Sequence, residues 1–227
     1  MSEIQVPNDE VSIDVQQPAS GNASDAFNLL RRFVRRRATA ERCDMCSAEL
    51  PVEHSHLIEP PTRQIVCACQ ACSILFSGSS DQRYRRIPRR IKFLQDFSLT
   101  EAQWDSLMIP IGMAFFFRSS LDQRVIALYP SPAGATESLL DLQAWNEIVT
   151  GNQTLSEMEL DTEALLVNRV NGANDYYLVP IDECFKLVGL IRTKWRGLSG
   201  GQDVWNAIEK FFNELKGRSN LVGKTDA

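Results

Sequence analysis

The sequence predicts an α+β protein in which a small cysteine-rich region precedes a mainly antiparallel sheet packed with helices. Five of the six cysteines and both histidines fall within residues 43–72 of the 227-residue chain. After this stretch, two pairs of strand-like segments alternate with segments of helical spacing. The clustered metal-binding side chains and the paired strands therefore predict two regions of different construction.

Composition divides the chain into five segments. The first segment is polar and acidic and has no apolar period, which is typical of a disordered tail. The second combines apolar residues at helical spacing with five arginines, which predicts a basic amphipathic helix. The expected boundaries are a disordered tail at 1–23, the basic helix at 24–41, a knuckle region at 42–80, an α+β domain at 81–218 and a second disordered tail at 219–227.

Charge is unevenly distributed along the chain. Residues 24–95 hold 13 Lys and Arg against seven Asp and Glu, whereas residues 96–227 hold 11 against 18. This asymmetry fits two regions with different partners, and it equally fits two regions that attract each other.

The sequence also bears on location. No apolar run reaches the roughly 18 residues of a membrane span, and the N-terminus lacks the basic and apolar parts of a secretory signal. We therefore expect a cytoplasmic protein without a membrane span. In that compartment clustered cysteines stay reduced and serve as metal-binding or redox groups.

The elements of the second region follow from local signals. Thr100 and Gln103 form a capping box for a short helix near 100–108. "IGMAFFFRSSLDQRVIALYPSP" predicts two strands joined by a polar loop, and "YPSPAGATES" at its end predicts a rigid loop leading to a helix. "SLLDLQAWNEIV" has helical spacing.

A second hairpin and two helices complete the predicted domain. The segments "EALLVNRV" and "YYLVPID" flank the turn signal "NGAND". Asp182 is placed to cap the helix that follows, in which Cys184 is expected to be a small buried hydrophobe. The final segment, "QDVWNAIEKFFNELKGR", predicts an amphipathic helix.

Two C-x-x-C pairs, Cys43/Cys46 and Cys69/Cys72, carry the strongest chemical signal. The 22 residues between them have the composition of a hairpin, and "SILF" after Cys72 can continue as a helix. A knuckle, a hairpin and a helix form the plan of a treble clef, so we predict a zinc knuckle with four thiolate ligands. A single iron, as in rubredoxin, or an iron–sulfur cluster is the alternative cofactor.

Cys67, His54 and His56 are additional donors in the same stretch. If 65–69 is a strand, Cys67 and Cys69 share a face, so Cys67 either replaces Cys69 or lines the site without binding. The two histidines are alternative metal ligands, hydrogen-bond donors to a thiolate ligand, or ordinary half-buried side chains. A closed four-cysteine site is structural rather than catalytic, and we expect no catalytic residues.

The string "CDMC…EHSHLIEP…VCACQAC" resembles the zinc-binding frame of HNH endonucleases. Those enzymes need a histidine directly after the second cysteine pair and an asparagine between the pairs. Here Ser73 follows Cys72, and no Asn lies between Cys46 and Cys69. The resemblance therefore implies a degenerate, non-nuclease relative.

A broader resemblance covers residues 42–216. "IPIGMAFFFRSS", "ALYPSPAGATES", "YYLVPIDECFKLVGLIRTKWRG" and "GGQDVW", together with the cysteine motif, are similar to a bacterial family of uncharacterised proteins whose genes often stand beside nickel–iron hydrogenase genes. The resemblance implies a non-enzymatic accessory protein that binds a protein partner in hydrogenase assembly or electron supply.

A basic run at 83–90 is the candidate surface for that partner. Nucleic acid is a weaker alternative as the partner, because the chain as a whole is acidic. A further alternative function is that of a rubredoxin-like iron or thiol redox carrier. The candidate partner-binding residues are Arg83, Arg85, Arg86, Arg89 and Arg90.

Overall fold

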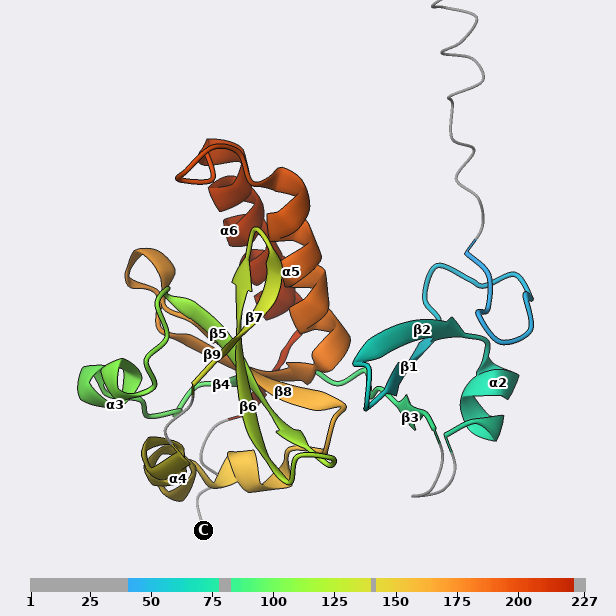
Figure 1. The fold of residues 1–227 in the computed structure, drawn as a ribbon, viewed down its shortest axis with the longest axis horizontal. Helices are drawn as coiled ribbons and strands as arrows, with labels where there is room; N and C mark the ends of the chain where they lie inside the picture. The colour runs from blue at the N-terminus through green and yellow to red at the C-terminus, as the bar shows by residue number, and fades with distance from the viewer. Residues whose placement is uncertain (1–40, 78–82, 140–141, 223–227) are drawn as a thin grey trace, which may run out of the picture. The chain divides into compact units, whose positions relative to one another are not determined.

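The computed structural model describes residues 41–77, 83–139 and 142–222 (Figure 1). The predicted tail at 1–23 and nearly all of the predicted basic helix at 24–41 lie outside these residues. Within them, a three-stranded sheet and a seven-stranded sheet combine with helices. The predicted α+β class with a mainly antiparallel sheet is confirmed.

The smaller sheet has the order β2-β1-β3 and belongs mainly to the knuckle region. Its strands are antiparallel, and a short helix follows the hairpin. A small core lies between the hairpin and the first cysteine turn, where Leu57 and Val66 pack with Cys43 and Cys72. The elements are β1 (Ser55–Glu59), β2 (Gln64–Ala68), α2 (Gln70–Leu75) and β3 (Arg85–Arg86).

The larger sheet has the order β10-β4-β9-β8-β5-β6-β7. Among its described strand pairs, β10 and β4 are parallel and the others are antiparallel. Its strands are β4 (Lys92–Leu94), β5 (Met113–Ser119), β6 (Arg124–Ser131), β7 (Gly134–Ser138), β8 (Glu163–Asn168), β9 (Asp175–Pro180) and β10 (Asn220–Val222).

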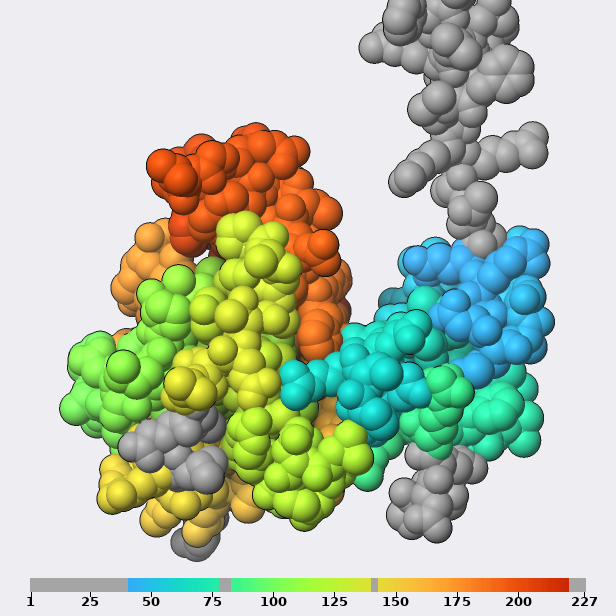
Figure 2. Space-filling model, viewed as in Figure 1, coloured from blue at the N-terminus to red at the C-terminus, as the bar shows by residue number. Residues whose placement is uncertain are grey.

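Helices pack on both faces of the larger sheet because its central strands are apolar on both sides. Along β5, Phe115 packs into the core covered by α5 and α6, whereas Phe116 packs into the core covered by α3 and α4. In Figures 1 and 2 the β6–β7 hairpin lies in front of α5 and α6. The helices are α3 (Glu101–Ser106), α4 (Leu142–Gly151), α5 (Ile181–Lys194) and α6 (Gln202–Arg218), with the 3-10 turns η1 (Gln153–Glu157) and η2 (Val170–Gly172).

Several local predictions can be compared with this fold. The capping box of Thr100 and Gln103 is present at α3, and both predicted hairpins form. The prediction of a loop for "YPSPAGATES" is wrong. This segment turns tightly at Gly134 (φ 129°) and returns as the edge strand β7. Asp182 does not cap α5, whose N-cap is Pro180.

The expected boundaries need two corrections. The predicted tail at 219–227 is wrong at its start, because residues 220–222 form β10 and pair with β4. The boundary at 80 divides a single sheet, since β3 pairs with β1. In addition, Ile58 on β1 belongs to the core under α5 and α6. The knuckle region therefore packs on the larger domain and shares part of its core.

Candidate metal centre

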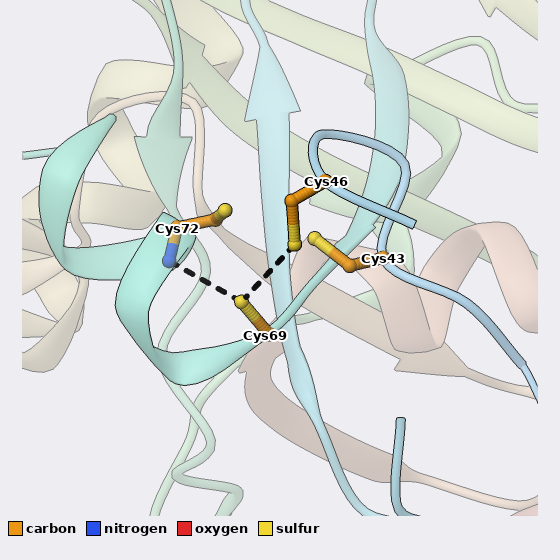
Figure 3. A group of neighbouring side chains, drawn as sticks. All are labelled: Cys43, Cys46, Cys69 and Cys72. Carbon is orange, nitrogen blue, oxygen red and sulfur yellow. Dashed lines mark hydrogen bonds between the residues drawn. The ribbon is translucent and has the colours of Figure 1, made fainter. Parts of the chain in front are cut away.

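Four cysteine side chains converge in the knuckle region (Figure 3). The sulfur atoms of Cys43, Cys46, Cys69 and Cys72 all lie within 4.8 Å of one another. All six cysteines of the chain are free of disulfides. The two C-x-x-C pairs thus meet in space, as their spacing predicted, and the group can hold one metal ion.

The first pair lies in a tight turn closed by backbone hydrogen bonds. Ser47 N–H donates to Cys43 O at 2.7 Å, and Cys43 N–H donates to Ala48 O at 2.8 Å. Ser47 takes the left-handed conformation (φ 62°), which lets the chain reverse directly after Cys46. Asp44 fixes the turn to the hairpin, because its N–H donates to Cys67 O at 2.9 Å and its carboxylate accepts from Cys67 N–H at 2.6 Å.

The second pair opens α2. Cys69 is the N-cap residue, and its sulfur accepts from Cys72 N–H at 3.5 Å. An N-cap side chain accepts hydrogen bonds from the first free N–H groups of a helix. The start of α2 therefore places Cys69 and Cys72 on one side of the same turn, facing the first pair (Figure 3).

The distances suit a tetrahedral thiolate site. Zn–S bonds of about 2.3 Å give a tetrahedron whose S···S edges are about 3.8 Å. The sulfurs of Cys46 and Cys69 are 3.8 Å apart. The four residues therefore fit a zinc or iron ion in spacing as well as in donor type.

The protonation of the thiols is uneven. Burial raises the pKa of Cys43, but N–H groups of Cys69, Cys46 and Met45 outweigh it and lower the pKa to about 6. Burial and hydrogen bonds with Cys69, Cys46 and Cys43 raise the pKa of Cys72 to about 12. One thiolate therefore opposes the ionisation of its neighbours, and a cation at the centre would supply the charge that lets all four ionise.

Cys67 lies apart from the four-sulfur group. Strand β2 ends at Ala68, so Cys69 leaves the strand and the alternation expected over 65–69 stops before it. Cys67 instead pairs with His56 across the hairpin, and the donor atoms of Cys67, His54 and His56 lie within 4.8 Å of one another. Burial and the nearby acids Asp44 and Glu41 raise the pKa of the Cys67 thiol.

Most of the basic run forms ion pairs within the chain. Arg83 pairs with Glu59, Arg85 pairs with Asp161 at 3.1 Å, and Arg90 pairs with Glu163 and Glu159. In residues 83–139 and the other described segments, Arg86 and Arg89 form no ion pair and are exposed. The role of these five arginines in partner binding stays a prediction.

Two further sequence predictions concern the missing nuclease histidine and the absence of a membrane span. Ser73, which stands where HNH endonucleases place a histidine, is buried and donates its hydroxyl to Gln70 O at 2.9 Å. No helix in the described part of the chain has the length and apolar character needed to cross a membrane.

One contact near the site was not predicted from the sequence. Asp182, on α5, accepts a 2.6 Å hydrogen bond from His56 Nδ1 on β1. The residues are 126 positions apart, and Asp182 had an adequate local explanation as a helix cap. The isolated histidine pair was the only sequence signal that a carboxylate partner was needed.

Comparison with known proteins agrees with the extent of the resemblance. Neither the curated proteins nor the solved structures contain a significant match to the chain. A protein family described as one of unknown function, DUF5947, matches residues 42–219, which span the cysteine site and the larger sheet. The chain therefore belongs to this family of unknown function, DUF5947.

Proposed function

We propose that this protein is a non-enzymatic accessory protein in which a four-cysteine zinc site keeps the knuckle region folded for binding a protein partner. The convergence of the four sulfurs carries the proposal. The core beside them is small, with Leu50, Leu57 and Val66 as its large aliphatic members. In so small a unit, metal binding contributes folding free energy directly.

Zinc is proposed rather than iron because the role proposed here is structural, and Zn²⁺ has no redox chemistry. Elemental analysis together with a visible spectrum of the purified chain tests this. We expect a colourless protein that contains zinc, and the Cys72→Ser substitution should remove the ion of the four-cysteine site. Visible absorption from bound iron would overturn the choice of zinc.

The partner proposal is supported by an exposed apolar edge beside the site. On α2, Ile74 is 59% and Leu75 is 68% exposed, and Phe76 follows at 43%. Apolar side chains grouped on a surface mark interaction sites more often than single ones do. The resemblance to proteins encoded beside nickel–iron hydrogenase genes directs the search to hydrogenase subunits and their assembly proteins.

A binding measurement with a matched control tests the partner proposal. Ile74→Asp places a charge on the α2 edge, whereas Leu198→Asp places the same charge at a fully exposed leucine in the α5–α6 loop. We expect Ile74→Asp to weaken binding to a purified hydrogenase component at least tenfold while Leu198→Asp leaves it unchanged. If the wild-type protein binds none of the hydrogenase subunits or assembly proteins, the hydrogenase role is refuted.

A further inference from the structure

The β1–β2 hairpin has a different set of donors on each face. Leu57 and Val66 pack beside the four-sulfur group, whereas their strand neighbours His56 and Cys67, which are direct cross-strand partners, alternate to the other face, and Cys67 also borders the small core. His54 precedes His56 by two positions, and its donor atoms join this second face. This face meets α5, where Asp182 contacts His56.

The hydrogen bonds of the two histidines define where their protons lie. His54 Nδ1 faces the carbonyl of Pro51 at 3.0 Å and the carboxylate of Glu41 at 3.5 Å. His56 Nδ1 faces the Asp182 carboxylate at 2.6 Å. Because these partners are acceptors, the tautomer that fits them has its proton on Nδ1 and leaves a lone pair at Nε2 of each ring.

In that tautomer the two lone pairs face each other. His56 Nε2 and His54 Nε2 are 3.1 Å apart, and the Cys67 sulfur lies within 4.8 Å of one nitrogen of each ring. Two lone pairs at this separation repel unless a cation lies between them. In a tetrahedral zinc site with Zn–N bonds of about 2.0–2.1 Å, N···N edges are about 3.3 Å.

We propose that His54 Nε2, His56 Nε2 and Cys67 Sγ form a second site for a divalent ion of the zinc class, with Asp182 orienting His56. A carboxylate that accepts the other N–H of a metal-binding histidine is the usual support of such ligands. Imidazole and thiolate donors together select zinc-class ions over magnesium or calcium. This site is distinct from the four-cysteine centre on the other face of the hairpin.

The second site differs from the first in its access. It has three protein ligands, which leaves a fourth position for water or a small ligand. His54, His56 and Asp182 line a cavity of about 310 Å³, which Arg89 and Arg218 also border. An ion here would join the knuckle region to α5 through His56 and Asp182.

Zinc stoichiometry of the full chain tests the proposal. The purified protein is stripped with a chelator, reloaded with Zn²⁺, and analysed by elemental analysis and native mass spectrometry. We expect two ions in wild type and one in Cys67→Ala. The Asp182→Asn variant should bind its second ion 10- to 100-fold more weakly, and Glu53→Gln, which also borders the cavity, should behave as wild type.

Cobalt loading identifies which ion is lost. Removal of the second site should subtract a one-thiolate charge-transfer spectrum and leave the four-thiolate spectrum in place. A wild-type protein that saturates with a single ion and shows only the four-thiolate spectrum would overturn the proposal and indicate a proton shared between the two Nε2 atoms.

The two metal proposals fail independently. An ion that persists in Cys46→Ser but disappears in Cys67→Ala would support the second site even if the four-cysteine centre were empty. If Cys67→Ala does not fold, the affinity of Asp182→Asn for its second ion decides the question. If Asp182→Asn binds the second ion as tightly as wild type does, the proposal is overturned.

Discussion

Arg90 holds the fully buried carboxylate of Glu163 in a two-pronged ion pair. Arg90 Nε is 2.6 Å from Glu163 Oε1, and its terminal nitrogen is 3.0 Å from Oε2. Burial of a carboxylate is costly unless a charged partner and further hydrogen bonds compensate it. Glu159 N–H supplies one such bond at 3.0 Å. The pair fixes the segment after β3 to the start of β8.

Removal of Arg90 should therefore destabilise the larger domain. We expect Arg90→Ala to lower the free energy of unfolding by about 3 kcal/mol, because Glu163 would keep only part of its compensation. Urea denaturation followed by circular dichroism measures this. The control is Arg89→Ala, which removes an exposed arginine without an ion pair in the described residues and should change stability by less than about 0.5 kcal/mol. Equal stability of the two variants would contradict the assignment.

Tyr177 offers a change in the opposite direction. Its hydroxyl is buried and has no hydrogen-bond partner within the described residues, while its ring packs between Phe93 and Phe212. Because an unpaired buried hydroxyl destabilises the folded state, Tyr177→Phe should raise the free energy of unfolding by about 1 kcal/mol.

A matched substitution separates this effect from a general preference for phenylalanine. Tyr176 O–H donates to Asn174 at 3.3 Å, so Tyr176→Phe should be neutral or slightly destabilising in the same urea experiment. A loss of stability in Tyr177→Phe would show that its hydroxyl has a partner.

Metal removal should act locally. Chelation is expected to abolish hydrogen-exchange protection in β1, β2 and α2, because their own core is small. Protection of β5, β8 and β9 should persist, since these strands lie at the centre of the larger sheet. Mass spectrometry of exchanged peptides measures both regions in one sample. Unchanged exchange over 42–77 in metal-free protein would refute a metal-dependent knuckle region.

Cys46 allows the metal contribution to be separated from packing. Its side chain is exposed, so in metal-free protein Cys46→Ser should change stability by less than about 0.5 kcal/mol. With zinc present, the same substitution should remove the zinc-dependent rise in the melting temperature of the knuckle region. An identical effect of Cys46→Ser with and without zinc would indicate that the thiol stabilises by contact alone.

Local patterns allowed much of the fold and the four-cysteine group to be predicted. The C-x-x-C spacing, the capping box of Thr100 and Gln103, and the alternation along β5 each depend on residues within a few positions of one another. The edge strand β7 was missed because its polar residues and Gly134 resemble a loop, and its pairing with β6 depends on a neighbouring strand.

By itself, the sequence determined that the cysteine pairs occupy a turn and the start of a helix, and that paired strands follow them. Tertiary structure alone decided that Asp182 meets His56, that Arg90 meets Glu163, and that residues 220–222 complete the sheet. The physical reason is that periodicity and capping act between neighbours along the chain. Contacts between distant segments instead arise when two cores pack, and no short-range pattern encodes which charged groups that packing buries together.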